Sequence, residues 1–321
     1  MSSEGKHPNV NYILDSGPAE IKRLSEQHFF IKALFDNPDL LPAAVDRSKI
    51  RRVLDAAAGT TAWALDLSDQ SFASKYEIYA SDITLSKFPP GEVLQRARIR
   101  TFQQDLTEPF AEDMKNTFDL VHMSALVFAL TEEGWKRMLR NVYDVLAPGG
   151  YLVMADSDLL LYTADEPPPQ DGIPHDVEAR RSGPSTIHSI NNIMAGLALE
   201  RGFVIGLSYR LTEMLSEAGF TVLSRQRALV PNGALLELQP SVRGNSLAHF
   251  RKPAAENGFT TLDTVTSVLL NKGELEAPRG VAIRDEDGRS KFMDDAKRAM
   301  NEGMLVVASE WVAQKRDLNG S

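Results

Sequence analysis

The chain opens with one amphipathic stretch, and short apolar runs then alternate with further helical patterns. Apolar residues repeat at nearly 3.6-residue spacing over Pro18–Phe35 and predict a helix that starts at Ser16-Gly17-Pro18. Asn37-Pro38 ends this helix, and a second short helix is predicted over Leu40–Val45. The apolar face of the first helix consists of Ile21, Leu24, His28, Ile31 and Phe35.

Five short apolar runs follow and predict strands, most of which end in or beside a polar residue. The predicted strands are Arg51–Asp55, Glu77–Asp82, Ile99–Asp105, Phe118–Met123 and Tyr151–Ala155. Helices are predicted between some of them, over Ala62–Ser68 and Gly134–Leu146. Strands that alternate with helices favour right-handed crossovers, so the pattern predicts an α/β fold with a largely parallel sheet.

The regular alternation stops after the fifth strand. Proline and glycine clusters over Asp156–Ile190 predict a long loop, and a long loop in a compact domain is often a lid over a site. The last predicted strand, Leu305–Gln314, has a pattern that also permits a helix. The other predicted elements are the helices Asn191–Glu200, Tyr209–Ala218, Leu262–Leu270 and Asp294–Met300, and a strand that starts over Gly219–Leu223.

Composition and charge narrow the class of protein. The 321 residues include 35 basic and 44 acidic ones, so the net charge of −9 argues against binding to nucleic acid or to an acidic membrane surface. A hydrophobic share of 43% excludes a wholly disordered chain. No apolar run approaches the roughly 20 residues of a membrane span, and the polar N-terminus lacks a signal core. Together with the absence of cysteine, this predicts a cytoplasmic protein.

Candidate chemistry lies between Val53 and Asp105. The first strand ends at Asp55, and the small residues of Ala56–Thr60 let the backbone approach a nucleoside closely. Asp82 ends the second strand 23 residues after Gly59, near the offset of roughly 20 residues at which a carboxylate binds ribose hydroxyls. Asp105 ends the third strand, where it is expected to accept from the exocyclic amine of adenine. The pattern predicts a nucleoside site at this edge of the sheet.

These segments, taken in order, resemble class I S-adenosylmethionine-dependent methyltransferases, and among them the fungal natural-product group with N, O or S acceptors. The resemblance implies a Rossmann-like sheet, mostly parallel with the last strand antiparallel, plus N-terminal helices and a lid insertion. It also implies S-adenosyl-L-methionine and a small-molecule acceptor. The matching segments are Val53-Leu54-Asp55-Ala56-Ala57-Ala58-Gly59-Thr60, Ser81-Asp82, Gln104-Asp105-Leu106, Phe118-Asp119-Leu120-Val121-His122, Leu146-Ala147-Pro148-Gly149-Gly150-Tyr151 and Gly219-Phe220, with Tyr12, Glu20, Arg23-Leu24 and Gln27-His28 ahead of them.

The resemblance also implies roles for individual residues. Asp55 is expected at the methionine end, with Ala56, Ala57 and Gly59 beneath the cofactor. Asp82 and Ile83 are expected at the ribose and adenine, Asp105 and Leu106 at the adenine ring, Met123 and Ser124 near the sulfonium, and Tyr12 and Arg23 over the site. The candidates for a general base, should the acceptor need one, are His28, His122 and His188.

One residue departs from the family pattern. Ala57 stands where the family usually has the first glycine of the turn, and an alanine there costs free energy if the turn needs a positive φ. Asp156-Ser157-Asp158 would suit a metal-dependent site, but no third ligand is near, so a solvated turn without metal is expected.

The resulting division of the chain has four parts. Residues 1–47 are predicted to form a helical cap, 48–156 the cofactor-binding core, 157–204 a lid or substrate insertion, and 205–321 the rest of the fold with additional helices. A cofactor-binding enzyme with a non-methylating, pericyclase-like reaction and a regulatory cofactor-binding protein stay open as alternatives. A homodimer also stays open, because Leu262–Leu270 is apolar enough to pack against a partner.

Overall fold

The computed structural model describes residues 18–35, 40–238, 241–242 and 245–316. Its centre is a seven-stranded sheet with the order β3-β2-β1-β4-β5-β9-β6. The strands of this sheet are β1 (Arg52–Ala56), β2 (Glu77–Asp82), β3 (Ile99–Gln103), β4 (Phe118–Ser124), β5 (Leu146–Tyr162), β6 (Phe220–Asn232) and β9 (Met304–Lys315). A separate pair consists of β7 (Ser241–Val242) and β8 (Asn245–Ser246).

The strand directions confirm the predicted α/β class. Strands β1 to β5 pair in parallel, whereas β9 pairs antiparallel with both β5 and β6. The last strand is therefore a strand and not a helix, and it is antiparallel as expected. The chain runs outward from β1 through β2 to β3 and then returns to β4 on the other side of β1. This reversal makes the carboxyl ends of β1 and β4 the usual place for a ligand in an open parallel sheet.

Helices cover both faces of the sheet. Helices α4 (Glu132–Val145) and α7 (Leu207–Glu217) pack on one face, around the buried Trp135 and Trp311. Helices α2 (Ala62–Ser68) and α3 (Gly91–Arg96) pack on the other. Helix α4 shows why the sequence folds this way, because its buried side chains recur every three or four residues. They are Gly134, Trp135, Met138, Leu139, Val142 and Val145.

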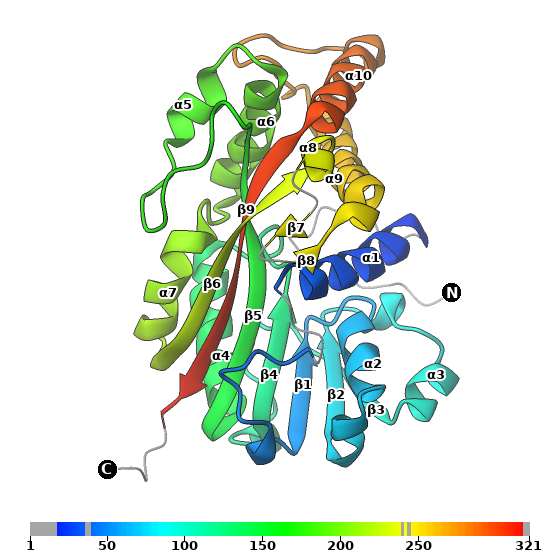
Figure 1. The fold of residues 1–321 in the computed structure, drawn as a ribbon, viewed down its shortest axis with the longest axis vertical. Coiled ribbons are helices and arrows are strands. Elements are labelled where there is room, and N and C mark those ends of the chain that lie inside the picture. Colours follow the sequence, from blue (N-terminus) through cyan, green and yellow to red (C-terminus); the bar gives the residue numbers. More distant parts are fainter. Residues whose placement is uncertain (1–17, 36–39, 239–240, 243–244, 317–321) are drawn as a thin grey trace.

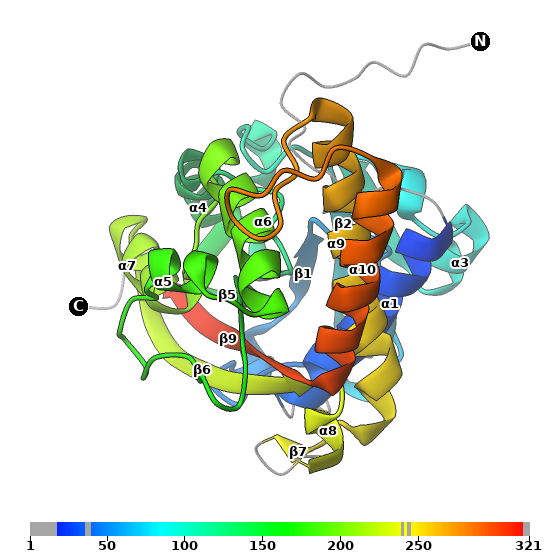
Figure 2. The ribbon, with the colours of Figure 1, turned by 90° about the horizontal axis from the view of Figure 1, so that it is seen from above.

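A second group of helices stands beyond the carboxyl ends of the central strands. Helix α1 (Pro18–Leu34) lies across these ends, and α9 (Arg251–Lys272) and α10 (Glu286–Glu302) rise above it (Figure 1). Seen from above, α6 (Thr186–Arg201) and the short α5 (Val177–Ser182) face α9 and α10 across the molecule (Figure 2). Helices α6, α9 and α10 share one apolar core. The remaining helix, α8 (Leu235–Leu238), follows β6.

Several predicted boundaries were wrong, and one predicted helix does not form. Residues 40–45 form bends and turns, because Leu40 has a positive φ of 64° and Asp46 instead caps the 3₁₀ turn Arg47–Lys49. The predicted loop Asp156–Ile190 contains the end of β5, all of α5 and the start of α6, whose N-cap is Ser185. Strand β6 and helices α9 and α10 are likewise longer than predicted.

The apolar stretch that left a homodimer open packs inside the chain itself. Leu262, Val265 and Leu269 belong to the core that α9 shares with α6 and α10. Their burial follows from intrachain contacts, so this stretch no longer calls for a partner.

The far end of β9 is held by one buried lysine. The Lys315 ammonium donates to Asn116 Oδ1 at 2.8 Å, to the Tyr143 carbonyl at 2.7 Å and to the Leu146 carbonyl at 2.8 Å. Burial lowers the pKa of Lys315. The lysine therefore fastens the end of β9 to the turn between α4 and β5.

We expect Lys315→Met to lower the free energy of unfolding by about 2–3 kcal/mol, because two carbonyls and an amide oxygen lose a charged donor. Urea unfolding measures the change. Lys252→Met is the control, since the Lys252 side chain is 84% exposed and the expected change is within about 0.5 kcal/mol. Equal effects of the two substitutions would contradict the anchoring role.

Candidate active site

A cavity of about 350 Å³ opens at the carboxyl ends of β1, β2 and β4, beneath α1. It lies at the reversal of strand order, where the topology predicts a ligand. Eight of the residues expected to bind the cofactor line it. They are Asp55, Ala57, Gly59, Asp82, Ile83, Asp105, Leu106 and Ser124.

The turn after β1 bends the backbone around this cavity. Ala57 and Gly59 both have a left-handed backbone, with φ values of 53° and 55°. The Ala58 N–H donates to the Ser81 carbonyl at 2.9 Å, and the Gly59 N–H donates to Asp82 Oδ2 at 2.8 Å. The turn therefore needs the conformation that glycine adopts most easily, and Ala57 adopts it at a cost in free energy.

Two carboxylates border the middle of the cavity. Asp82 accepts from the Gly59 N–H and, at 3.3 Å, from the Thr84 N–H. Burial raises the pKa of Asp82 even though these N–H groups act in the opposite direction. Asp105 lies just after β3 and uses Oδ1 to accept from the Thr107 N–H and hydroxyl. Both carboxylates are thus fixed by local bonds at successive strand ends.

A buried pair lies at the ends of β1 and β4. The His122 Nδ1 lies 2.8 Å from Asp55 Oδ1, and the His122 ring stacks on Trp63 with centroids 4.0 Å apart. Burial lowers the pKa of His122, so we assign a neutral ring that donates from Nδ1. Asp55 Oδ2 is buried and has no hydrogen-bond partner among the described residues. A buried carboxylate oxygen that lacks a partner fits a ligand that donates a hydrogen bond.

Three of the predicted site residues lie outside this cavity. Ala56 and Met123 are fully buried and line neither this cavity nor the neighbouring one, because successive side chains of a strand point to opposite faces. His188 is buried on α6 between Ser185 and Glu166 and lines neither this cavity nor the neighbouring one. Tyr12 lies outside the described residues.

The remaining two predicted residues, Arg23 and His28, hold α1 in place. His28 Nε2 lies 2.9 Å from Asp66 Oδ2, and Lys32 binds the same carboxylate, so α1 is tied to α2. Arg23 binds the Glu20 carboxylate and, at 2.7 Å, Asn257 Oδ1 of α9. His28 lines the cofactor cavity, whereas Arg23 lines a second, neighbouring cavity.

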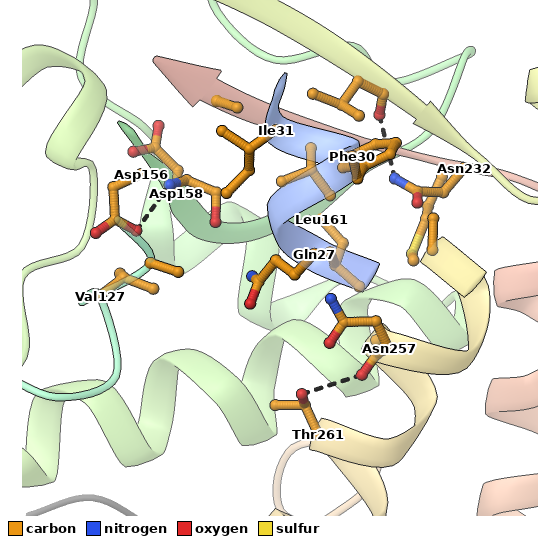
Figure 3. A pocket seen from close by; sticks show the side chains of 18 of the residues that line it. Gln27, Phe30, Ile31, Val127, Asp156, Asp158, Leu161, Asn232, Asn257 and Thr261 are labelled. Atoms are coloured by element: carbon orange, nitrogen blue, oxygen red, sulfur yellow. Dashed lines mark hydrogen bonds between the residues drawn. The ribbon is translucent and has the colours of Figure 1, made fainter. Parts of the chain in front are cut away.

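That second cavity has a volume of about 220 Å³ and lies between α1, β5, β6, β9 and α9. Figure 3 shows Gln27, Phe30 and Ile31 entering it from α1, with Asn257 and Thr261 on α9. Most of its other lining side chains are apolar. They include Leu34, Val127, Phe128, Leu159, Leu161, Ile190, Met194, Val230, Phe250, Leu262, Met300, Met304 and Val306.

The two cavities meet. Gln27, Ile31 and Ala125 line both of them. Ala125 follows β4 and has a positive φ of 57°, so the chain turns sharply at the junction. A ligand in the first cavity and a ligand in the second would therefore approach each other near these residues.

Asp156 is a candidate functional residue whose surroundings were predicted wrongly from the sequence. It lies within β5, lines the second cavity and is only 6% exposed, so the expected solvated turn was wrong. Its carboxylate accepts from the Leu126 N–H at 2.7 Å and the Ser157 N–H at 2.9 Å. Burial nevertheless raises the pKa of Asp156 to about 7. The feature of the sequence that could have indicated a site residue here was an acid directly after a predicted strand.

Asp158, the other acid of the segment Asp156-Ser157-Asp158, has different hydrogen-bond partners. Its two oxygens accept from the Ser208 N–H and hydroxyl and from His175 Nε2, which lies 2.6 Å away. Tyr162 in turn bonds the other ring nitrogen of His175. Within the described ranges, no group of three or more His, Cys, Asp or Glu side chains is arranged to hold a metal ion.

No helix among the described residues is long and apolar enough to span a membrane.

Comparison with known proteins agrees with the site. Residues 53–150 match the family model described as methyltransferase domain. The N-methyltransferase sirN of Leptosphaeria maculans is 24% identical over 226 residues, which span 70% of this chain and 72% of that protein. Methyltransferase pytC of Aspergillus terreus is 24% identical over 88% of this chain and 78% of its own length. The secondary metabolism regulator laeA of Gibberella zeae is 28% identical, and the chain spans 45% of its length.

Among solved structures, the [4+2]-cyclase SpnF is 15% identical with a TM-score of 0.45, over 92% of this chain and 81% of that one. A protein of Galdieria sulphuraria described as a candidate sarcosine dimethylglycine methyltransferase is 14% identical, with a TM-score of 0.43. The match covers 93% of this chain and 86% of that one.

Sheet topology, site and family match together define the class. Residues 53–150 match a methyltransferase domain, and the strand order of the sheet is the one expected for the class I, S-adenosylmethionine-dependent type. Its relatives include fungal proteins named as methyltransferases, as the sequence motifs predicted.

We expect Ala57→Gly to raise the free energy of unfolding by about 1 kcal/mol, because glycine adopts a positive φ without a Cβ clash. Thermal and urea unfolding measure the change. Ala58→Gly is the matched control: Ala58 is not among the residues with positive φ, so we expect a loss of roughly 0.5–1 kcal/mol. A loss of stability in both variants would contradict the strain at Ala57.

We expect Asp156 to make stability depend on pH. Its pKa is about 7 in the folded chain against 3.8 in the reference state, so folding favours the protonated carboxyl. The protonated Asp156 carboxyl stabilises the folded chain fully below about pH 4. This stabilisation is lost as the pH rises to about 7, and it stays lost above that pH. Relative to Asp156→Asn, the wild type should lose up to roughly 4 kcal/mol over that range. Urea unfolding between pH 4 and 8 measures the difference, and parallel pH profiles would contradict the prediction.

Proposed function

We propose that this protein transfers the methyl group of S-adenosylmethionine to an N, O or S atom of a small molecule, where the two cavities meet. The observation that carries the proposal is the shared lining by Gln27, Ile31 and Ala125. A methyl donor in one cavity and an acceptor in the other would then lie next to each other. Positioning of this kind supplies much of the rate enhancement when the electrophile is already activated.

The residues of the first cavity suit the donor. Asp82 would accept from the ribose hydroxyls, while Ile83, Asp105 and Leu106 would contact the adenine. Asp55 Oδ2, which lacks a partner among the described residues, would accept from the amino group of the methionine part. When bound, S-adenosylmethionine supplies a methyl group that its sulfonium charge has already activated. The protein has to hold and shield the reactants.

The second cavity favours an acceptor with an apolar body. Its polar groups are few and include Gln27, Asp156, Asn232 and Asn257. Leu159, Leu161, Ile190 and Met194 line it from residues 157–204, which supports our assignment of that segment to the substrate part of the chain. The relatives named as secondary metabolism regulators support a role in secondary metabolism. A net charge of −9 argues against nucleic acid as acceptor.

The other parts of the chain keep their predicted roles in this proposal. Residues 1–47 would cap both cavities through α1, residues 48–156 would hold the donor, and residues 205–321 would complete the sheet and the acceptor cavity. The absence of cysteine from the 321 residues supports the predicted cytoplasmic location.

A second candidate function rests on a different observation. One relative is named a secondary metabolism regulator, so a cofactor-binding protein with a regulatory role is the alternative. Product mass and chromatographic retention together separate the candidates when the protein is incubated with fungal metabolite extracts and S-adenosylmethionine. Methyl transfer adds roughly 14 Da to one compound, a pericyclase-like reaction changes the retention of a compound at unchanged mass, and a regulator changes neither.

We expect Asp82→Ala to weaken S-adenosylmethionine binding at least about 30-fold, or roughly 2 kcal/mol, because two sugar hydroxyls lose a charged acceptor. Isothermal titration calorimetry measures the affinity. Asp82→Asn should have a smaller effect, since its amide oxygen still accepts from the Gly59 N–H.

Asp113→Ala provides the control, because Asp113 is exposed and lines neither cavity. Its affinity should equal that of the wild type. Unchanged affinity in Asp82→Ala, or a wild type that does not bind S-adenosylmethionine, would overturn the proposed site.

A further inference from the structure

Asp156 lines the acceptor cavity and follows Ala155, whose carbonyl accepts from the N–H of Ala125, a residue that lines both cavities. The Asp156 carboxylate accepts from the N–H of Leu126, which lines the cofactor cavity. The left-handed turn at Ala125 brings the next two N–H groups, those of Leu126 and Val127, onto this carboxylate. A non-glycine residue in a left-handed conformation at such a point is a form of strain often found at functional sites.

Other acids near the acceptor cavity are placed differently. Asp158 bonds the Ser208 hydroxyl and the His175 ring, whereas the partners of Asp156 are backbone N–H groups. The Glu26 side chain is 38% exposed and lies near Lys22. Glu310 lies across from Ala155 on β9 and lines neither cavity. Asp156 thus combines burial, a place in the lining of the acceptor cavity and hydrogen bonds from backbone N–H groups.

The three histidines proposed as bases are less well placed. His28 pairs with Asp66, and His122 pairs with Asp55 in the cofactor cavity. His188 lines neither cavity. Of the three rings and the Asp156 carboxylate, Asp156 is the one that lines the acceptor cavity.

We propose that Asp156 is a catalytic residue, the group that takes the proton from the nucleophilic N–H or O–H of the acceptor. This inference rests on the proposed methyl transfer. As the acceptor atom bonds to the methyl carbon, the electron pair of the broken C–S bond stays on sulfur, and the acceptor's proton passes to a carboxylate oxygen of Asp156. Asp156 later releases the proton to water. The substrate class narrows to acceptors that carry hydrogen on the reacting atom, such as alcohols, phenols and N–H compounds.

The surroundings of Asp156 suit this task. A general base works best when its pKa is near the operating pH, and burial raises that of Asp156 to about 7. The charged groups around it are Asp158 on the same strand, Glu310 on β9, and Arg23 and Glu26 on α1. The lining residues of α6 and α9 are uncharged. Asp158 raises the pKa of Asp156 further, and the backbone N–H groups lower it.

The test uses two probes that occupy the donor cavity, sinefungin and S-adenosylhomocysteine. Sinefungin carries an amine where the sulfonium carries its methyl group, whereas S-adenosylhomocysteine has no group there. In the wild type, the Asp156 carboxylate should bind the sinefungin ammonium. We expect the ratio of the two affinities, measured by calorimetry, to favour sinefungin about tenfold more in the wild type than in Asp156→Asn at pH 8.

The ratio should also depend on pH. In the wild type it should rise from pH 5.5 to pH 8 as Asp156 ionises, and in Asp156→Asn it should stay flat. The wild-type profile alone tests the proposal if the variant does not fold. Asp113→Asn, at an exposed position, is the surface control and should follow the wild type.

The outcomes are distinct. An equal ratio in wild type and Asp156→Asn, or a flat wild-type profile, overturns the role of Asp156. Loss of the preference in Glu26→Gln but not in Asp156→Asn assigns the contact to Glu26 and overturns it as well. A wild type that binds neither probe overturns the proposed function together with this inference.

Discussion

The antiparallel pairing of β5 with β9 is the contact on which the rest of the site depends. The pairing runs from Tyr151 opposite Gln314 to Tyr162 opposite Leu305, with an irregularity between Ser157 and Leu161. Because β9 satisfies the backbone of β5 beyond the edge of the parallel sheet, β5 can remain a buried strand there. This extension carries Asp156, Leu159 and Leu161 into the lining of the acceptor cavity.

Helix α1 closes both cavities through two separate anchors. His28 and Lys32 fix it to Asp66 of α2, while Arg23 reaches Asn257 of α9. Its remaining inward side chains, such as Gln27 and Ile31, are then free to form the wall that the cavities share. The two residues that the motifs assigned to cofactor and base chemistry, Arg23 and His28, thus serve mainly to position the helix.

Two buried aspartates show how the surroundings set the state of a carboxyl group. Asp55 faces the imidazole of His122, which compensates part of its burial, and keeps one oxygen without a partner among the described residues. Asp156 has backbone N–H groups and a second carboxylate nearby, so burial raises its pKa to about 7. One acid is therefore suited to holding an ammonium group and the other to exchanging a proton near neutral pH.

The sequence by itself determined the alternation of strands and helices and the acids at the ends of β1 and β2, because both follow from local periodicity and from short spacings along the chain. It could not decide that β5 and β6 extend so far, since both pair with β9, which lies far away in the sequence and about 150 residues from β5. For the same reason it placed Asp156 in a solvated turn. Whether a polar side chain is buried, and what it faces, depends on residues from several elements, and only the tertiary structure brings those residues together.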